Sequence, residues 1–351
     1  MSTSSSERPS SRGTMAVAAV TADEPSMWAI VQDEYGPAAE VVLRLERTTR
    51  PSIGADEVLV HVAAASVDRG TWHIMSGLPY PIRGAGFGLR APKALNPGRS
   101  MAGTIASTGR NVTEFATGDE VFGTCEGSFA EYACARPTRL AFKPANLSFE
   151  QAAAVPVSGL TALQAVRDHG HVRPGEQVLV VGASGCVGTF AVQIAKAFGA
   201  EVTGVCSSAK TDVVYALGAD HVVDYTREDL TRGERRYDVI LDTGGNRRLS
   251  DLRRALSPRG RLVIVGGETG GRWLGGSERS IRALLLSPLV RHKLGTFVAS
   301  ENAADLIVLR DLIEAGQVAP VVDRTYPLSE VAAAVRYLQE GRARGKLVIS
   351  M

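Results

Sequence analysis

The sequence predicts an α/β chain built from two units, a β-rich, barrel-like unit and a doubly wound parallel sheet. Three observations support this fold class. The length of 351 residues suits about two domains. Short candidate strands separated by turn residues fill the first part of the chain. After residue 150, apolar strands and helical patterns alternate, which is typical of a parallel sheet with helices on both faces.

The composition excludes several classes of protein. Hydrophobic residues make up 44% of the chain and charged residues 22%, which is ordinary for a globular protein. The net charge of +2 gives no field that would attract nucleic acid or anionic lipid. The 4 cysteines form no C-x-x-C pair and are too few for a disulfide framework. No apolar run approaches the ~20 residues of a membrane span. We expect a cytoplasmic protein without nucleic-acid binding or stable membrane insertion.

The first 26 residues differ from the rest of the chain. They are rich in serine and lack large apolar side chains, so they can bury little surface. The apolar stretch 15–22 is weak for the central region of a signal peptide. We therefore expect residues 1–26 to form a disordered tail.

The barrel-like unit is predicted from short strands and their turns. Glycine turns at Gly36-Pro37 and Gly118-Asp119 separate the strand candidates. The segment 71–97 is rich in glycine, proline and arginine, and we interpret it as a long irregular loop of the kind that often carries function. The strand candidates are 28–31, 41–45, 57–65, 100–108 and 120–123.

The second unit begins with a helix-capping pattern, Ser148-x-x-Gln151, before an alanine run. A helix over 160–169 leads to a strand at 177–181, whose last four residues are apolar, as in parallel strands covered on both faces. The following elements are helix 187–198, strand 201–206, helix 211–217, strands 221–223 and 238–241, helix 249–256, and strands 261–265 and 296–299. The chain closes with helices 303–315 and 329–339 and a strand at 346–350.

A glycine-rich turn follows the strand at 177–181. Gly185 and Gly188 match the last two glycines of G-x-G-x-x-G, whereas Ala183 stands where the first would be. Between a strand and a helix, such a turn presents backbone N–H groups and a helix N-terminus to the pyrophosphate of a dinucleotide. An ordinary tight turn is the alternative. We expect the cofactor to contact Ala183, Ser184, Gly185, Cys186, Val187 and Gly188.

The end of the second parallel strand selects the dinucleotide. An acidic residue there would bind a ribose hydroxyl and repel a 2′-phosphate, and none is present. Ser207, Ser208 and Lys210 instead offer donors and positive charge. Tyr225, after the third strand, adds a hydroxyl. We therefore predict NADPH rather than NADH, although Lys210 could be a solvated lysine and Tyr225 a packing residue.

The ends of two further strands carry polar or glycine residues. Asp242 ends the fourth strand, and Gly266 and Gly267 end the fifth. Ligands of open α/β sheets bind at the carboxyl ends of the strands, so we expect these residues near the nicotinamide ribose. Simple turn formation is the alternative.

Short segments along most of the chain have counterparts in one enzyme superfamily. They are 64–68 (Ala-Ala-Ser-Val-Asp), 118–123, 127–132, 152–156, 159–162, 192–196, 217–220 and 345–348. Through them the chain, from residue 27 to residue 351, resembles the medium-chain dehydrogenase/reductase superfamily, in its zinc-free, quinone-oxidoreductase-like branch.

The resemblance implies a division of the chain. A GroES-like catalytic domain would be formed by 27–150 and 301–351, and a Rossmann domain that binds NADPH by 151–300, with the active site in the cleft between them. It also implies that Thr161 lies along the cofactor and Lys346 near its phosphates.

The resemblance also bears on zinc. Zinc-dependent members bind the metal through a cysteine and a Gly-His-Glu element. The matching segments here are Ser66-Val67-Asp68 and Gly98-Arg99-Ser100, which offer neither thiolate nor imidazole. We therefore expect no metal.

Without a metal Lewis acid, a quinone or an α,β-unsaturated carbonyl compound is a better substrate than a simple alcohol, because hydride addition leaves charge that delocalises onto oxygen. The candidates for orienting or protonating it are Asp68, His73 and Tyr80. The family usually has asparagine where Asp68 stands, and an ionised aspartate accepts rather than donates. The alternatives are an alcohol-dehydrogenase-type enzyme of the same fold and a non-catalytic, NADPH-binding regulatory protein.

The segment 270–293 is basic around an apolar stretch at 283–290. A lid, a dimer contact and a membrane-surface helix all fit this pattern. We favour a lid or a dimer contact, and we expect a homodimer.

Overall fold

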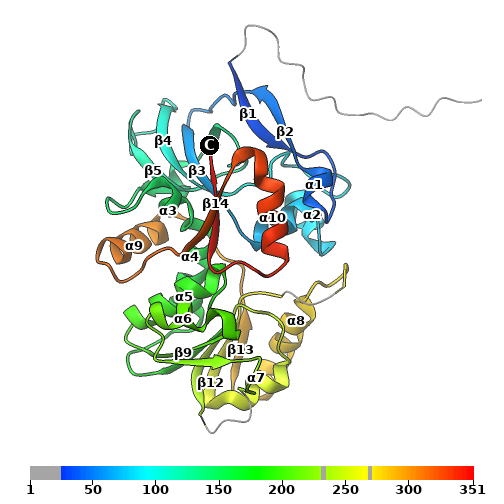
Figure 1. Ribbon diagram of the computed structural model, residues 1–351, viewed down its shortest axis with the longest axis vertical. Helices are drawn as coiled ribbons and strands as arrows, with labels where there is room; N and C mark the ends of the chain where they lie inside the picture. The colour runs from blue at the N-terminus through cyan, green and yellow to red at the C-terminus, as the bar shows by residue number, and fades with distance from the viewer. Residues whose placement is uncertain (1–24, 231–234, 268–270) are drawn as a thin grey trace, which may run out of the picture.

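The computed structural model describes residues 25–230, 235–267 and 271–351, so nearly all of the predicted tail lies outside the described residues. Its strands form two large sheets, one above the other in Figure 1, and a separate two-stranded pair. The upper sheet contains the C-terminal strands beside strands from the first part of the chain, whereas the lower sheet is built from the middle of the chain.

The upper sheet has seven strands in the order β14-β15-β3-β4-β5-β7 with β6 paired beside β3. β15 pairs antiparallel with β3, so both ends of the chain build one sheet. The strands are β3 (Val58–Val67), β4 (Ser100–Thr108), β5 (Glu120–Thr124), β6 (Tyr132–Ala135), β7 (Leu140–Phe142), β14 (Val322–Pro327) and β15 (Lys346–Ser350). The separate pair is β1 (Ser26–Val31) with β2 (Arg44–Thr49).

The lower sheet is parallel, with six strands in the order β10-β9-β8-β11-β12-β13. This is the order of the doubly wound dinucleotide-binding fold, in which ligands bind at the carboxyl ends of the strands where the order reverses, here between β8 and β11. The strands are β8 (Gln177–Val181), β9 (Glu201–Cys206), β10 (His221–Asp224), β11 (Tyr237–Asp242), β12 (Leu256–Ile264) and β13 (Lys293–Thr296).

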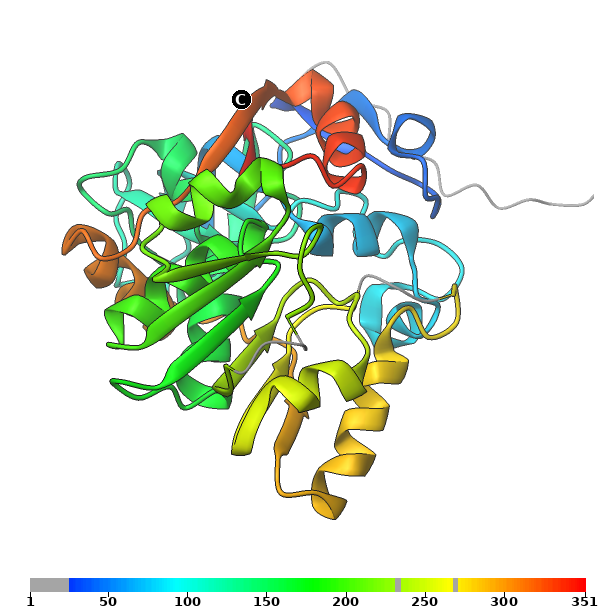
Figure 2. The same ribbon diagram turned by 60° about the horizontal axis from the view of Figure 1, so that its bottom comes forward.

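Helices cover both faces of the parallel sheet because alternate strand residues point to opposite sides. Val178 and Val180 pack in the core that contains α5 and α6, whereas Leu179 and Val181 pack in the core that contains α7 and α8. These helices are α5 (Cys186–Ala197), α6 (Thr211–Ala216), α7 (Leu249–Ala255) and α8 (Ser277–Leu286). Figure 2 shows α7 and α8 lying beside this sheet.

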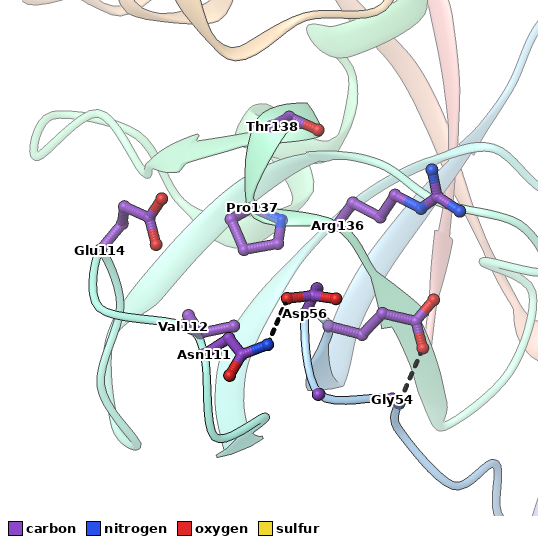
Figure 3. A pocket seen from close by; sticks show the side chains of 10 residues that line it. Gly54, Asp56, Asn111, Val112, Glu114, Arg136, Pro137 and Thr138 are labelled. Carbon is purple, nitrogen blue, oxygen red and sulfur yellow. Dashed lines mark hydrogen bonds between the residues drawn. The ribbon is translucent and has the colours of Figure 1, made fainter.

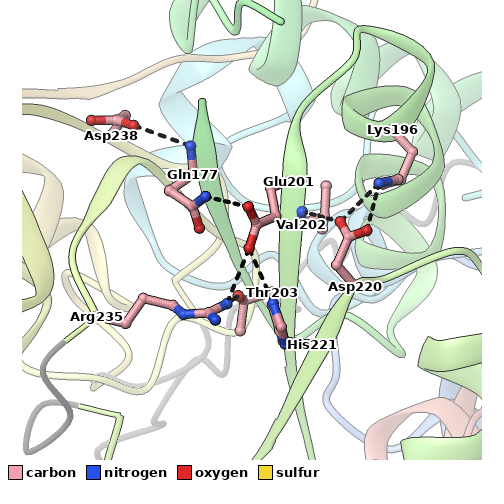
Figure 4. A network of polar contacts seen from close by, with 9 residues as sticks. All are labelled: Gln177, Lys196, Glu201, Val202, Thr203, Asp220, His221, Arg235 and Asp238. Carbon is pink, nitrogen blue, oxygen red and sulfur yellow. Dashed lines mark hydrogen bonds and ion pairs between the residues drawn. The ribbon is translucent and has the colours of Figure 1, made fainter. Parts of the chain in front are cut away.

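A polar network closes the amino edge of the same sheet (Figure 4). Glu201, which begins β9, accepts from the amide of Gln177 and contacts His221 at 3.0 Å. The hydrogen bond from Gln177, and then that with His221, lowers the pKa of the Glu201 carboxyl. Asp220 accepts from Val202 N at 2.7 Å and pairs with Lys196 at 2.8 Å. These contacts fix the strand starts, and the ligand-binding carboxyl edge lies at the other end.

One apolar core runs from the parallel sheet to the seven-stranded sheet. It contains residues of α3 (Phe149–Ala153), α4 (Pro156–Gln164) and α9 (Ala303–Glu314), and α3 packs against β3 and β4. Ser148 caps α3 through the expected reciprocal pair with Gln151. Because α3 belongs to this shared core, the fold has no sharp break at residue 150. The proposed division into 27–150 with 301–351, and 151–300, stays a prediction.

Two predictions for the first unit, a strand and a loop, are wrong in part. The expected strand at 41–45 is interrupted, because α1 (Ala39–Val42) precedes β2, and Ala39 and Val42 pack against a core that includes α10 (Val331–Gln339). The expected irregular loop 71–97 begins instead inside α2 (Arg69–Ser76) and contains the π-helical turn η1 (Arg83–Phe87). Asp68 and Thr71 form a capping box that starts α2, a local signal within the sequence.

The last parallel strand also lies earlier than expected. β13 spans Lys293–Thr296 rather than 296–299, because its register is set by pairing with β12. Beyond it, Val298 is 95% exposed. The short strands β6, β7 and β14 were not expected. The remaining short helices are η2 (Pro137–Arg139), η3 (Ala165–His169), η4 (Ser208–Lys210), η5 (Ser287–Leu289) and η6 (Leu328–Glu330).

Candidate active-site cleft

A cleft of about 560 Å³ lies at the carboxyl edge of the parallel sheet. Its walls combine the start of α2, the start of α4, the turn after β8 and the turn after α10. It therefore brings together segments that are up to 275 residues apart in the sequence, from Asp68 to Ala343. The sequence-predicted residues in its walls are Asp68, His73, Thr161, Ser184, Gly185, Cys186, Val187, Ser207, Lys210, Tyr225, Gly266 and Gly267.

The turn after β8 has the geometry that the glycine spacing predicts. Gly182 has a φ of +81°, a conformation that favours glycine. Its N–H and that of Ala183 both donate to Val205 O, which holds the turn against β9. At Gly188, an added Cβ would lie 2.1 Å from Gly182 O, so the helix can approach the strand only with glycine there. Ala183 and Gly188 therefore shape the turn from behind the wall, and the structure does not place them in the wall itself.

Gly185 has a different reason to be glycine. Its φ is −85°, and an added Cβ would meet only Gly182 O, at 3.3 Å, a tight contact that a shift of a few tenths of an ångström would relieve. Gly185 lines the cleft and is the N-cap of α5, where no side chain caps the helix. The first-turn N–H groups of a helix have no partners within it, and they favour an anion. The open space in front of Gly185 therefore fits the pyrophosphate of a dinucleotide.

The residues at the end of β9 are only partly available to a ligand. Ser207 and Tyr225 line the cleft. Lys210 Nζ donates to Gly341 O at 3.0 Å and to Ala343 O at 2.7 Å, which leaves one of the three N–H groups of an ammonium for a ligand. Burial and the nearby Arg344 lower the pKa of Lys210.

Ser208 does not join the wall. Its hydroxyl donates to Asp224, the last residue of β10, and shares a 2.9 Å contact with Thr226 Oγ1. These contacts hold Ser208 toward β10 and away from the cleft. The expectation that Ser208 binds the cofactor directly does not fit this geometry.

Arg247 is a cleft residue that the sequence did not reveal. It follows β11 in the cleft wall, and its guanidinium carbon lies 6.0 Å from the centre of the Tyr225 ring. Arg248 is equally basic, but the structure does not place it in the wall. No sequence signal separates the two arginines, because only the packing of the turn after β11 decides which of them faces the cleft.

Asp242 lies behind the wall rather than in it. Its carboxylate is fully buried, pairs with Arg279 of α8 and accepts from Gly245 N at 3.1 Å. Burial raises the pKa of this carboxyl, and Arg279 opposes the shift. Asp242 thus fixes the turn that presents Thr243 and Gly244 to the cleft. The expectation of direct cofactor contact by Asp242 is replaced by this supporting position.

Two of the three catalytic candidates face the cleft. Asp68 caps α2, accepting from Thr71 N at 3.2 Å through Oδ1, while Oδ2 is buried without a hydrogen-bond partner among the described residues. His73 Nδ1 lies 2.7 Å from Leu78 O. A carbonyl only accepts, so Nδ1 carries the hydrogen and Nε2 is the ring nitrogen left for other contacts.

Tyr80 is not in the cleft wall. Its N–H donates to Arg272 O at 2.8 Å, and its ring packs edge-on against Trp273 with centroids 5.2 Å apart. Figure 2 shows the segment before α8 beside the segment after α2. Tyr80 therefore links the two units through Arg272 and Trp273, while Arg83 of its own segment also lies over its ring, 4.9 Å from the centroid.

Lys346 is likewise behind the wall. Its side chain is fully buried, with Nζ 3.1 Å from Ser158 Oγ and 3.8 Å from Asp68 Oδ2. Ser158 lines the cleft, but Lys346 does not. The residue before it, Gly345, accepts from Cys186 Sγ at the start of α5, and the position of Lys346 near the cofactor phosphates stays a prediction.

A second hollow, of about 610 Å³, lies in the first unit and is shown in Figure 3. Its walls include Asp56, Asn111, Glu114 and Arg136. Asn111 Nδ2 donates to Asp56 Oδ1 at 2.8 Å. The hollow shares no residue with the cleft and contains none of the sequence-predicted site residues, so we assign it no role in the chemistry.

The expected lack of zinc stays a prediction. Within the described ranges, no three His, Cys, Asp or Glu residues gather as ligands for one ion. Ser66 and Ser100, in the segments where zinc-dependent relatives have ligands, are paired across β3 and β4 and fully buried.

Comparisons with known proteins agree with this architecture. A family model described as "Alcohol dehydrogenase GroES-like domain" matches residues 54–145, and one described as "Zinc-binding dehydrogenase" matches residues 217–349. The chain is 32% identical to the mouse (Mus musculus) protein "NAD(P)H oxidoreductase RTN4IP1, mitochondrial" over 368 residues, which cover 95% of this chain and 92% of the relative.

Two further oxidoreductases are similar to this chain over most of its length. The Arabidopsis thaliana protein "NADPH-dependent alkenal/one oxidoreductase, chloroplastic" is 32% identical over 97% of this chain and 84% of its own length. The solved quinone oxidoreductase of Coxiella burnetii superposes with a TM-score of 0.81 at 28% identity, covering 93% of this chain and 100% of that one. With the cleft and the two sheets, these matches show that the chain belongs to the medium-chain dehydrogenase/reductase superfamily, in its quinone-oxidoreductase-like branch, and is a nicotinamide-dependent oxidoreductase.

Proposed function

We propose that the protein is a zinc-independent, NADPH-dependent reductase of quinones or α,β-unsaturated carbonyl compounds. The observation that carries this proposal is the cleft itself. The glycine turn leaves open space at the N-terminus of α5, and the neighbouring wall carries Lys210 after β9 and Arg247 after β11. The names of the mouse, Arabidopsis and Coxiella relatives support the same class of reaction.

The preference for NADPH rests on the charges near Tyr225. A 2′-phosphate is an anion that favours ionised donors with short hydrogen bonds. Lys210 offers its one remaining N–H, Arg247 adds a guanidinium in the same wall, and Ser207 and Tyr225 add hydroxyls. An adenosine ribose without the phosphate would bring these two cations no anion from the nucleotide, which disfavours NADH.

The choice of substrate rests on what the cleft provides. When bound, the reduced nicotinamide supplies a hydride. The chain itself provides orientation, a wall of small and apolar residues around Gly266 and Val157, and polar groups at Asp68, Ser158 and His73. This set suits a conjugated acceptor, whose reduction needs a positioned donor at oxygen rather than a metal ion.

The test is turnover by the purified full-length protein. We expect loss of the reduced-nicotinamide absorbance with NADPH and at least one member of a panel of quinones and enones, unchanged by a metal chelator. NADPH binding without turnover on any acceptor would favour the regulatory alternative, and activity abolished by the chelator would favour a zinc enzyme.

The homodimer stays a proposal that the edge of the parallel sheet supports. Among the described strands, β13 has a partner on one side only. Next to it, α8 and η5 expose Leu284, Leu285 and Leu289 by 53, 70 and 80%. An unpaired edge beside an apolar patch is typical of an interface. A dimer by light scattering that dissociates in Leu285→Asp would support it, and a wild-type monomer would contradict it.

The cytoplasmic location also stays a proposal. The named mouse relative is mitochondrial and the Arabidopsis relative chloroplastic. Among the described helices, none has the length and hydropathy needed to cross a bilayer.

A further inference from the structure

A buried ammonium lies one side chain away from the cleft. Lysine is almost never fully buried unless it is paired, yet Lys346 has no exposed surface. Its Nζ is 3.1 Å from Ser158 Oγ and 3.8 Å from Asp68 Oδ2. Both of these partners line the cleft. The buried charge is therefore connected to the substrate space through two side chains.

The direction of the hydrogen bonds follows from the chemistry of the groups. An ammonium only donates, so Ser158 Oγ accepts from Lys346. A serine hydroxyl has one hydrogen of its own, and no residue in the described part of the chain accepts it. Ser158 belongs to the cleft wall but is itself fully buried, so its hydroxyl hydrogen lacks an acceptor until a substrate displaces the cover over this part of the wall.

We propose that Lys346 is the proton source of the reduction and that Ser158 passes the proton to the substrate oxygen. This inference rests on the proposed reduction of a quinone or an enone. When the conjugated carbon gains a hydride, negative charge develops on the carbonyl oxygen. The Ser158 O–H bond then breaks as a new O–H bond forms on that oxygen, and a Lys346 N–H bond breaks as its proton moves to Ser158 Oγ.

The electron and proton counts balance. The substrate has gained one hydride and one proton, Ser158 is unchanged, and Lys346 is left as a neutral amine. A proton from solvent restores the ammonium before the next turnover.

Asp68 acts in this arrangement as a positioning residue. Its Oδ2 has no hydrogen-bond partner among the described residues and lies 3.8 Å from the Lys346 ammonium, so it supplies the opposite charge beside which the ammonium is held. This explains how an aspartate serves where the family usually has asparagine. The other charged or titratable groups that face the pair are Arg69 and the Cys186 thiol, whose pKa burial raises and Lys346 opposes.

Three variants separate proton donation from charge and from folding. Lys346→Met removes the donor, and Lys346→Arg keeps a positive charge that releases no proton. The double variant Asp68→Asn with Lys346→Met removes both charges, so that no unpaired carboxylate is left buried. We expect all three to bind NADPH within about 3-fold of wild type. We expect all three to lose ~100-fold or more in kcat with an enone, which is the usual contribution of a general acid.

Two further measurements would not respond to a purely structural role. An electron-poor quinone yields a weakly basic oxygen, so its kcat should fall much less than that of the enone. The second measurement needs no cofactor. Lys346→Met should slow alkylation of Cys186 by iodoacetamide, followed at that peptide by mass spectrometry, because the charge that favours the thiolate is lost. Lys346→Arg should keep the wild-type rate.

Three results would overturn the proposal. Recovery of enone turnover in Lys346→Arg to within about 3-fold of wild type would mean that only the charge matters. NADPH binding weakened more than ~10-fold in Lys346→Met with kcat unchanged would mean that Lys346 binds a phosphate instead. Equal loss of kcat with both acceptors would mean that the variants disturb the fold of the cleft. Failure of the proposed function itself would appear in the wild-type protein, as no turnover on any acceptor.

Discussion

Replacing Gly185 by alanine is expected to weaken NADPH binding and to leave the fold intact. The new methyl group would meet only Gly182 O, at 3.3 Å, on the protein side, and the φ of −85° suits alanine. Because Gly185 caps α5 in the cleft wall, the methyl group would instead occupy space in front of the first-turn N–H groups. The pyrophosphate would be pushed away from these donors.

The magnitude follows from the contacts that are lost. Each hydrogen bond to a charged group contributes about 1.5–3 kcal/mol, so losing one or two of them raises the Kd for NADPH by ~10- to 20,000-fold. For the fold, reduced freedom of the unfolded chain contributes about 0.4–1 kcal/mol of stability. Alanine is a poorer N-cap than glycine by a similar amount. The two terms nearly cancel, and we expect Tm to change by no more than ~4 °C.

Gly188→Ala is the matched control, three residues further along the same turn. Its methyl group would lie 2.1 Å from the backbone oxygen of Gly182, which forces the helix away from the strand. Overpacking of this kind costs about 1–3 kcal/mol or more. We expect Gly188→Ala to lower Tm clearly and Gly185→Ala to spare it. Nucleotide titration and thermal unfolding measure both effects, and a Gly185→Ala protein that binds NADPH as tightly as wild type would refute the reasoning.

Three further predictions concern charge. Arg247→Gln should lower the NADPH preference over NADH by ~10-fold, the loss of about one charged hydrogen bond, whereas Arg248→Gln should leave the KM ratio unchanged. Burial lowers the pKa of Lys210, so its ammonium loses the proton at a pH below the usual lysine range. We therefore expect kcat/KM for NADPH to decline at that alkaline pH, and kcat/KM for NADH to show no such decline. The hydrogen bond from Gln177 depresses the folded pKa of Glu201, so the stabilising effect of this carboxylate is present above the unfolded pKa and is lost as the pH falls through the folded pKa. Glu201→Gln should therefore flatten the acid side of a urea-unfolding series.

The phosphate turn was predictable because its determinants are local. Gly185 and Gly188 stand at a fixed spacing between a strand and a helix, and steric limits act within the turn itself. The parallel strands were predictable for a similar reason, because apolar runs such as 177–181 are covered on both faces. At these positions the structure contains the turn and the strand that the sequence predicts.

The rest of the cleft depends on contacts between distant segments. The partners of Lys210 are the carbonyls of Gly341 and Ala343, about 130 positions later, which no local pattern indicates. Arg247 and its neighbour differ only in the direction that the turn after β11 gives them.

Asp68 shows a different limit of sequence reasoning. The Asp-x-x-Thr pattern that starts α2 is a local signal for a helix, but the glycine, proline and arginine residues that follow it favour an irregular loop over 71–97. Lys346, the partner of Asp68, begins the last strand, and only the pairing of β15 with β3 brings the two together.

Nucleotide affinity of the purified full-length chain tests the central claim most directly. Titration with NADPH and with NADH should give saturable binding of both, tighter for NADPH by ~10-fold or more, or about 1.4 kcal/mol. Tighter binding of NADH, or no binding of either nucleotide, would contradict the assignment of this cleft.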